Sequence, residues 1–283
     1  MCTLLLTSNP YHISKAFNTP TFVSRASKNS PGTLWALDFT KTRDQDLIIG
    51  TKIRAQGFDP DSEPDDVMGQ ARLYLLHMHS PTGDTWREHP ASKQINNVEM
   101  GYEISAHLWH NGQVINTPNG VWDTSDLLDN LIHDVAFAGT SGSQFVDEMG
   151  GLIKWDYLDE VEGSFAGALF INVKPLDSGG VDTPSESRLY VFRNNMSPLI
   201  ARTPMTMEPY QRVPRLTDPI YMDETSYISS VPLVGDESNS KWSKVPSNVI
   251  FRVDLHSHSE LNEPIFTLAA ARLINNTYNP YGV

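Results

Sequence analysis

The cysteine at position 2 is the residue best suited to covalent chemistry, and it is the only cysteine among 283 residues. Removal of the initiator methionine, which is usual before a small side chain, would leave Cys2 with a free α-amino group. Such an amine has a pKa of about 8 and a thiol one of about 8.5, so the amine can accept the thiol proton at little cost. Cys2 would then supply both nucleophile and base. The alternative is an ordinary, partly buried cysteine near a chain end.

An Asn-Gly pair follows His110 in the sequence His110-Asn111-Gly112. The side-chain amide of Asn111 and the N–H of Gly112 could together stabilise an oxyanion if the backbone aims both at one point. Asn-Gly between two apolar runs is also the strongest short signal for a β-hairpin. We therefore predict a hairpin turn at residues 111 and 112. This turn either forms an oxyanion hole or has no catalytic role.

Several histidines and acidic residues raise the question of a metal. His77 and His79 alternate along an expected strand and so share a face, which His107 and His110 could join. Zinc could bind such a group, but histidines are common near polar active sites. The acidic stretch Asp59–Asp66 lacks the EF-hand order of ligands and glycine, so it is interpreted as an exposed loop. We expect neither a metal nor a cofactor.

The order of the motifs resembles that of the class II glutamine amidotransferases, which are N-terminal nucleophile (Ntn) hydrolases. The resemblance runs from residue 2 to about residue 255, and it depends on the shared order because each motif alone is weak. The matching segments are Met1-Cys2, Leu75–Gly83, His89-Pro90, His110-Asn111-Gly112, Asp123-Thr124-Ser125, Glu162–Ala166, Leu189–Arg193, Ser197–Leu199 and Tyr227–Ser230.

The resemblance implies a role for each catalytic residue. Cys2 would be the nucleophile, with its own amine as base. The Asn111 side chain and the Gly112 N–H would bind the oxyanion. Asp123 would bind the α-amino group of glutamine, with Asp126 as the alternative. The implied reaction is hydrolysis of glutamine to glutamate and ammonia through a thioester on Cys2.

His79 departs from the family pattern, because it stands where the family has the arginine that pairs with the α-carboxylate of glutamine. Arginine offers a permanent charge and a two-pronged donor, whereas histidine offers one donor per nitrogen and can be neutral. Either His79 carries the charge, or Arg72 or Arg87 takes its place, or the substrate is not glutamine. Thr82 and His110 complete the implied substrate-binding residues.

Hydrophobic periodicity predicts strands on both sides of a helical middle section, which is typical of an α+β fold. Ser125 is expected to cap a helix that runs to Val135, and Phe145–Asp156 is expected to form a second helix. The resemblance implies a four-layer αββα sandwich of two antiparallel sheets, the Ntn-hydrolase fold. The expected strands cover residues 3–7, 33–39, 47–53, 71–79, 102–110, 114–116, 164–173, 188–193, 227–232 and 249–255.

We expect one class II glutamine amidotransferase-like domain over residues 2–256 and a C-terminal tail over residues 257–283. The tail holds a possible short helix, Pro264–Ile274, and could dock a partner. Because the tail is too short for a synthase, we expect a separate ammonia-accepting synthase subunit. Two alternatives stay open: an Ntn amidohydrolase acting on another amide, and an inactive binding or structural protein with the same fold.

The bulk composition excludes some partners. The formal net charge is −13, so general electrostatics do not favour binding to nucleic acid or to an anionic membrane. No apolar run approaches the ~18 residues of a membrane span, and the start lacks the features of a signal peptide. We therefore expect a cytoplasmic protein.

Overall fold

The computed structural model describes residues 2–23, 32–38, 47–53, 73–79, 89–97, 102–132, 153–175, 186–203, 219–236, 242–255 and 266–278. The helices are α1 (Pro10–Phe17), α2 (Pro20–Val23), α4 (Asp123–Leu131) and α6 (Tyr157–Glu160). The strands are β1 (Thr3–Thr7), β2 (Gly32–Asp38), β3 (Leu47–Ile53), β4 (Leu73–Met78), β5 (Ala91–Asn97), β6 (Tyr102–Val114), β7 (Gly163–Pro175), β8 (Glu186–Arg193), β9 (Ile200–Arg202), β10 (Ile220–Met222), β11 (Tyr227–Ser229), β12 (Trp242–Lys244), β13 (Val249–Leu255) and β14 (Phe266–Leu273).

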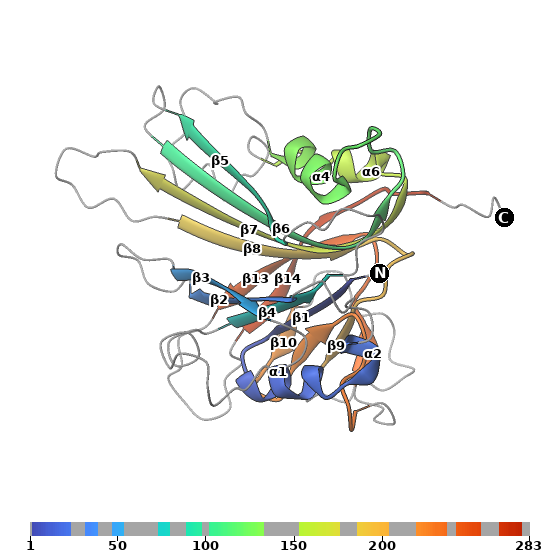
Figure 1. The fold of residues 1–283 in the computed structure, drawn as a ribbon. Helices are drawn as coiled ribbons and strands as arrows, with labels where there is room; N and C mark the ends of the chain where they lie inside the picture. Colours follow the sequence, from blue (N-terminus) through green and yellow to red (C-terminus); the bar gives the residue numbers. More distant parts are fainter. Residues whose placement is uncertain are drawn as a thin grey trace.

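Two antiparallel sheets lie face to face, with α1 and α2 on the outer side of one and α4 and α6 on the outer side of the other (Figure 1). Within the described residues, the first sheet has the order β12-β9-β11-β1-β4-β2-β3 and the second β10-β14-β13-β8-β7-β6-β5. The expected α+β sandwich of four layers is therefore confirmed.

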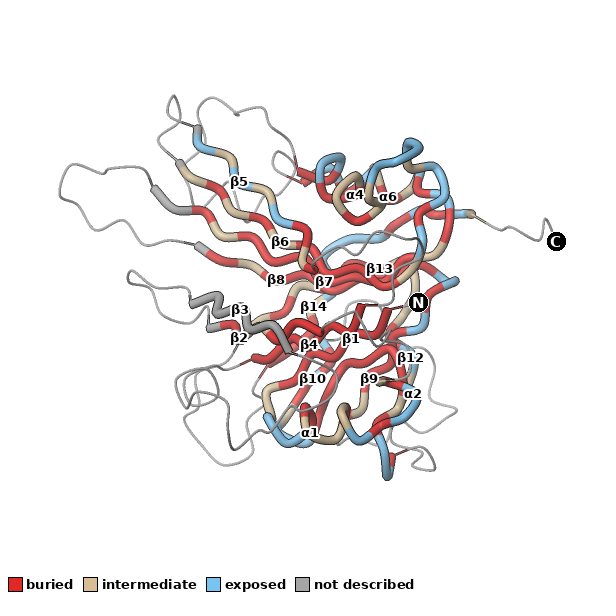
Figure 2. The backbone as a smooth tube through the Cα atoms, in the orientation of Figure 1, coloured by how far each residue is buried: buried red, intermediate tan, exposed pale blue. Residues whose placement is uncertain are grey.

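Strand β1 lies in the middle of the first sheet, and all five of its residues are buried (Figure 2). Leu4 and Leu6 point into the core between the two sheets, whereas Leu5 points into the core beneath α1 and α2. A strand covered on both faces needs apolar residues on both, which explains the unbroken Leu-Leu-Leu run. The first residues of the chain are thus fixed by packing on every side.

The Asn-Gly pair does not form a hairpin turn, so that prediction was wrong. Strand β6 runs straight through it, with Asn111 opposite Ala166 and Gly112 opposite Phe165 of β7. Gly112 has a φ of +151°, and a Cβ at this position would collide with the carbonyl oxygen of Ser164. A glycine is required here because the two strands approach closely, and the long pairing with β7 outweighs the local turn preference.

Helix α4 begins at Asp123, with Trp122 as N-cap, rather than after Ser125 as expected. The Asp123 carboxylate accepts a hydrogen bond from the Thr124 N–H at 2.8 Å, and a negative charge in the first turn is favourable to the helix dipole. Most of the helix expected over Phe145–Asp156 lies outside the described residues. Its described end forms a bridge between Ile153 and Ile132, and α6 follows.

The helix expected over Pro264–Ile274 is also wrong, because this segment forms strand β14. Strand β14 lies between β13 and β10 in the second sheet, and its Phe266 and Leu268 are fully buried. Burial of these two side chains outweighs the helix preference of the alanines that follow. Residues 266–273 therefore belong to the sandwich and not to a free tail.

Other expectations concern residues that the structure does not describe. The acidic loop Asp59–Asp66, Thr82 and the two arginines at positions 72 and 87 lie outside the described ranges. Among the described helices, none combines the length and the apolar character needed to cross a membrane.

Buried His12 on α1 links the stability of the fold to pH. Its Nδ1 lies 2.7 Å from the Thr7 hydroxyl, and its ring packs on Tyr227. Burial lowers the pKa of His12 to about 4, assisted by the positive charges of Lys15 and Arg202 and opposed by Asp236 and Asp223. The unfolded chain then binds more protons between pH 6.5 and 4, so this part of the stability is present above pH 6.5 and is lost as the pH falls through that window.

We predict that His12→Gln makes the free energy of unfolding less dependent on pH, because a neutral amide has no such proton uptake. Denaturant unfolding of both proteins at about pH 7 and about pH 4.5 measures this difference. Thr21→Ala, on an exposed and non-titrating position of α2, is the control. Equal pH slopes for the wild type and His12→Gln would contradict the prediction.

Candidate active site

Cys2 stands directly before the central strand β1, and only 6% of it is exposed. Strand β1 pairs with β4 in the register Thr3 opposite Met78, so the next pair along is Cys2 and His79. His79 follows the last residue of β4 and is also buried. The sheet itself therefore places the thiol beside the histidine that stands at the family's arginine position.

A single hydroxyl joins the strand of Cys2 to Asn111 on the opposite sheet. Asn111 is fully buried, and its Nδ2 donates to Ser230 Oγ at 3.0 Å. The same Oγ accepts from the Leu4 N–H at 3.1 Å, while the Ser230 N–H donates to the Leu4 carbonyl at 2.9 Å. Residues 4, 111 and 230 thus form one network, two positions from Cys2.

The backbone of Asn111 is held from the other side by the turn after β8. Ser197 Oγ donates to the Asn111 carbonyl at 3.2 Å. Asn194 Oδ1 accepts from the Ser197 N–H, and the Arg193 guanidinium donates to the Ser197 carbonyl at 2.8 Å. The end of β8 and the turn that follows it therefore position the backbone of Asn111.

The pairing around Gly112 directs its N–H away from β7. Phe165, the partner of Gly112, uses both its N–H and its carbonyl for bonds with Asn194. Gly112 and Phe165 are therefore a non-hydrogen-bonded pair of the antiparallel ladder. In such a pair the Gly112 N–H points away from β7, and the Phe165 N–H points away from β6. On that side of β6, β5 pairs only as far as Leu108. The Gly112 N–H is thus directed past the end of β5.

Three buried histidines pack against one another next to Cys2. The ring centroids of His77 and His89 lie 4.1 Å apart and those of His79 and His89 4.9 Å apart, and Trp122 lies edge-on to His89 at 5.0 Å. Burial lowers the pKa of His77 to about 3 and that of His79 to about 4, and it lowers the pKa of His89 as well. At neutral pH these imidazoles are therefore uncharged.

His89 is the residue for which the sequence analysis gave no role. Its His-Pro motif matched the family pattern, and that match was the available signal. It stands two residues before β5 begins at Ala91, and its ring contacts those of His77 and His79 near the end of β4.

Asp123 lies at the edge of the same site. Its Oδ2 accepts from the Val114 N–H at 3.3 Å and lies 3.9 Å from His110 Nδ1, which in turn lies 3.2 Å from the Thr124 hydroxyl. Asp123 is only partly buried, and its negative charge acts on both His79 and His110 against the effect of burial. Asp126, the alternative residue, instead accepts from Asn130 of its own helix.

One group of side chains among the described residues could hold a metal ion. It consists of Cys2, His79 and His89, whose ligand atoms all lie within 4.8 Å of one another. The sequence pattern suggests a different group, made of His77, His79, His107 and His110. His107 does not join the group at Cys2, because its Nδ1 bonds to Ser92 and its ring lies against Trp35 and Trp109.

No protein-family model matches this sequence, and no curated protein matches it either. Several solved structures are similar to the chain, among them the following three. Glutamine phosphoribosylpyrophosphate amidotransferase from B. subtilis, complexed with ADP and GMP, is 13% identical with a TM-score of 0.45, covering 89% of this chain and 47% of that one. A structure described as the allosteric regulatory enzyme of purine biosynthesis is 12% identical with a TM-score of 0.46, covering 89% and 46%.

The third is a predicted glutamine amidotransferase from Pseudomonas aeruginosa PA01, with 13% identity, a TM-score of 0.37 and coverage of 89% of this chain and 96% of that one. The present chain thus spans about half the length of the first two structures.

We predict that Ser230→Ala destabilises the protein by about 1–3 kcal/mol, because the buried Leu4 N–H and the Asn111 amide both lose their acceptor. Denaturant unfolding measures the loss. Ser125→Ala, on a half-buried position of α4, is the matched control and should change the stability by less than about 0.5 kcal/mol. Equal effects of the two substitutions would mean that the Ser230 hydroxyl does not join the sheets.

Proposed function

We propose that this chain is an N-terminal-cysteine amidohydrolase of the glutamine amidotransferase type, which hydrolyses glutamine to glutamate and ammonia. The observation that carries the proposal is the network of Leu4, Ser230 and Asn111. It fixes an amide donor on one sheet against the strand that presents Cys2 on the other. A nucleophile and an oxyanion donor held by one hydrogen-bonded unit are the minimum that acyl transfer requires.

The first step is attack on the substrate amide. Removal of Met1 frees the Cys2 amine, which takes the thiol proton, and the thiolate bonds to the side-chain carbonyl carbon. Asn111 Nδ2 has a second N–H besides the one bonded to Ser230. This N–H and the Gly112 N–H stabilise the oxyanion.

The second step releases ammonia and then glutamate. The protonated α-amine gives its proton to the leaving nitrogen as the C–N bond breaks, which leaves a thioester on Cys2. A water molecule, deprotonated by the same amine, attacks the thioester. Glutamate leaves and the thiol is restored, so the reaction needs no cofactor.

Asp123 is the proposed partner of the substrate's α-ammonium group. Its carboxylate lies at the edge of the buried site and is partly exposed, so an arriving cation can reach it. His110 anchors Asp123 and Thr124 at the start of α4. We assign Thr82 and His79 to the carboxylate side of the substrate, following the family resemblance.

We further propose that a separate synthase subunit receives the ammonia. The described residues are taken up by the four layers of the sandwich, so none of them forms a second catalytic domain. Because the mechanism depends on a reduced thiol, we place the protein in the cytoplasm, where thiols are kept reduced.

We predict that Asn111→Ala lowers kcat for glutamate release a few hundredfold, since one oxyanion donor contributes about 3–4 kcal/mol. Cys2→Ala should reduce release to background. The assay uses the chain alone and with candidate synthases, after intact mass spectrometry has established that Met1 is absent. Gln113→Ala, an exposed neighbour on β6, is the control.

A diazoketone analogue of glutamine should label Cys2 in the same preparation, and peptide mapping identifies the labelled residue. If there is neither labelling of Cys2 nor glutamate release under any of these conditions, the protein is not a glutaminase. Such a result would favour the alternative of an inactive binding or structural protein.

A second candidate function, hydrolysis of an amide without an α-carboxylate, is favoured by the state of His79. Burial holds the pKa of His79 near 4, so this residue offers no positive charge to a carboxylate at neutral pH. Glutamine and 4-aminobutanamide differ only in that carboxylate. For a glutaminase we predict that kcat/KM is at least about tenfold higher for glutamine, which corresponds to one useful ionic contact of about 1.4 kcal/mol. An equal or higher value for 4-aminobutanamide would select the second candidate.

A further inference from the structure

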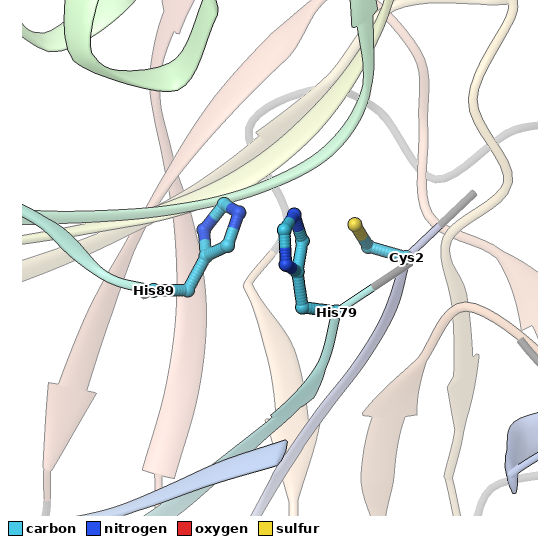
Figure 3. Close-up of side chains that lie close together, drawn as sticks. All are labelled: Cys2, His79 and His89. Carbon is cyan, nitrogen blue, oxygen red and sulfur yellow. The ribbon is translucent and has the colours of Figure 1, made fainter. Parts of the chain in front are cut away.

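Cys2, His79 and His89 converge from three separate elements of the fold. Cys2 precedes β1, His79 follows β4, and His89 precedes β5. Figure 3 shows the three side chains pointing toward one another, with the His79 ring between the other two. One ligand atom from each lies within 4.8 Å of the others, and all three residues are buried.

We propose that these three residues form a binding site for a single zinc ion. One thiolate and two imidazoles form a ligand set typical of zinc. Three protein ligands leave the fourth tetrahedral position for water or for a substrate atom, which is the arrangement of an open zinc site.

The histidines have nitrogens that the protein does not use. Nδ1 of His79 and Nδ1 of His89 are both buried, and neither has a hydrogen-bond partner among the described residues. Buried polar atoms without partners are rare in folded proteins and call for an explanation such as a bound ion. Both residues are less than 10% exposed, and in Figure 3 the His79 ring lies between His89 and the Cys2 thiol.

The three ligand atoms have to move closer together to bind one zinc ion. Ligands held about 2.0–2.3 Å from a tetrahedral zinc lie roughly 3.5 Å from one another. The largest separation, up to 4.8 Å, therefore has to shrink by up to about 1.3 Å. Cys2 and His79 flank the paired ends of β1 and β4, so their backbones are already adjacent and side-chain rotation has to supply the movement.

Surrounding groups support the site without taking part in it. His77 packs on His89, but its Nε2 is bonded to the His110 carbonyl at 3.1 Å. Trp122 also lies edge-on to His89. The negative charge of Asp123 acts on His79 and favours a cation there. Such outer contacts orient metal ligands and tune their affinity.

Zinc bound here would hold Cys2 as a coordinated thiolate and remove it from attack on an amide. Zinc would therefore act as a reversible inhibitor, a consequence that depends on the proposed function. Metal binding itself does not depend on it, and so it is tested by a readout other than activity.

The test is a spectroscopic titration of the chelator-treated full chain with Co²⁺, followed by displacement with Zn²⁺. We expect one Co²⁺ per chain, the visible bands of tetrahedral cobalt, and a near-ultraviolet charge-transfer band from the Cys2 sulfur. C2S should abolish that band, and H79Q and H89Q should each weaken binding by roughly tenfold or more. H107Q is the matched control, because His107 on β6 makes the same histidine-to-glutamine change at a residue that bonds to Ser92 instead.

Two results would overturn the proposal. One is the absence of tetrahedral cobalt bands in the wild-type chain. The other is unchanged binding in C2S, H79Q and H89Q, which would place the metal elsewhere. Thermal unfolding of each metal-free variant checks that it is folded. If a histidine variant does not fold, C2S decides the question, since it exchanges a single sulfur for oxygen.

If glutamate release proves measurable, zinc should inhibit the wild type, and H89Q should be inhibited less. If no release is found, the cobalt spectra still decide whether the metal site exists. The failure of the amidohydrolase proposal and the failure of the zinc proposal are therefore distinguishable.

Discussion

The site depends on the burial of the first strand between two layers of side chains. Strand β1 has no face open to solvent, and its backbone is tied to Ser230 through two hydrogen bonds with Leu4. Because Asn111 binds the same serine, one hydroxyl group links the two sheets at this point, next to the bond between His77 Nε2 and the His110 carbonyl. Cys2, the proposed nucleophile, stands at the head of this strand and therefore has little positional freedom, as a reaction that requires accurate approach would need.

The same burial determines the electrostatics of the site. The histidines beside Cys2 lose their charge because water is excluded from them, and the carboxylate of Asp123 at the edge only partly opposes this. The buried group therefore combines uncharged imidazole nitrogens with a thiol, and the partly exposed Asp123 carboxylate lies nearby. Both features bear on the two proposals, a substrate with a cationic end and a bound metal cation.

Sequence reasoning predicted much of the scaffold and less of the site. The strands at 3–7, 47–53 and 249–255 have the predicted bounds, because short apolar runs rich in leucine and β-branched residues favour strands. The turn at Asn111-Gly112 and the helix at 264–274 were wrong, since pairing with β7 and with β13 outweighs local preference. The His89-Pro90 motif gave no role for His89, because only the assembly of three elements brings this residue to Cys2.

Strand β14 has a practical consequence for how the protein is produced and divided. It fills the place between β10 and β13, so a recombinant form ending at residue 256 would expose the hydrogen-bonding edges of both neighbours. Open edges of this kind attract other chains and lead to inclusion bodies. Expression plasmids and two-hybrid fragments should therefore extend beyond Asn276, whose side chain also bonds to the carbonyls of Leu158 and Val161.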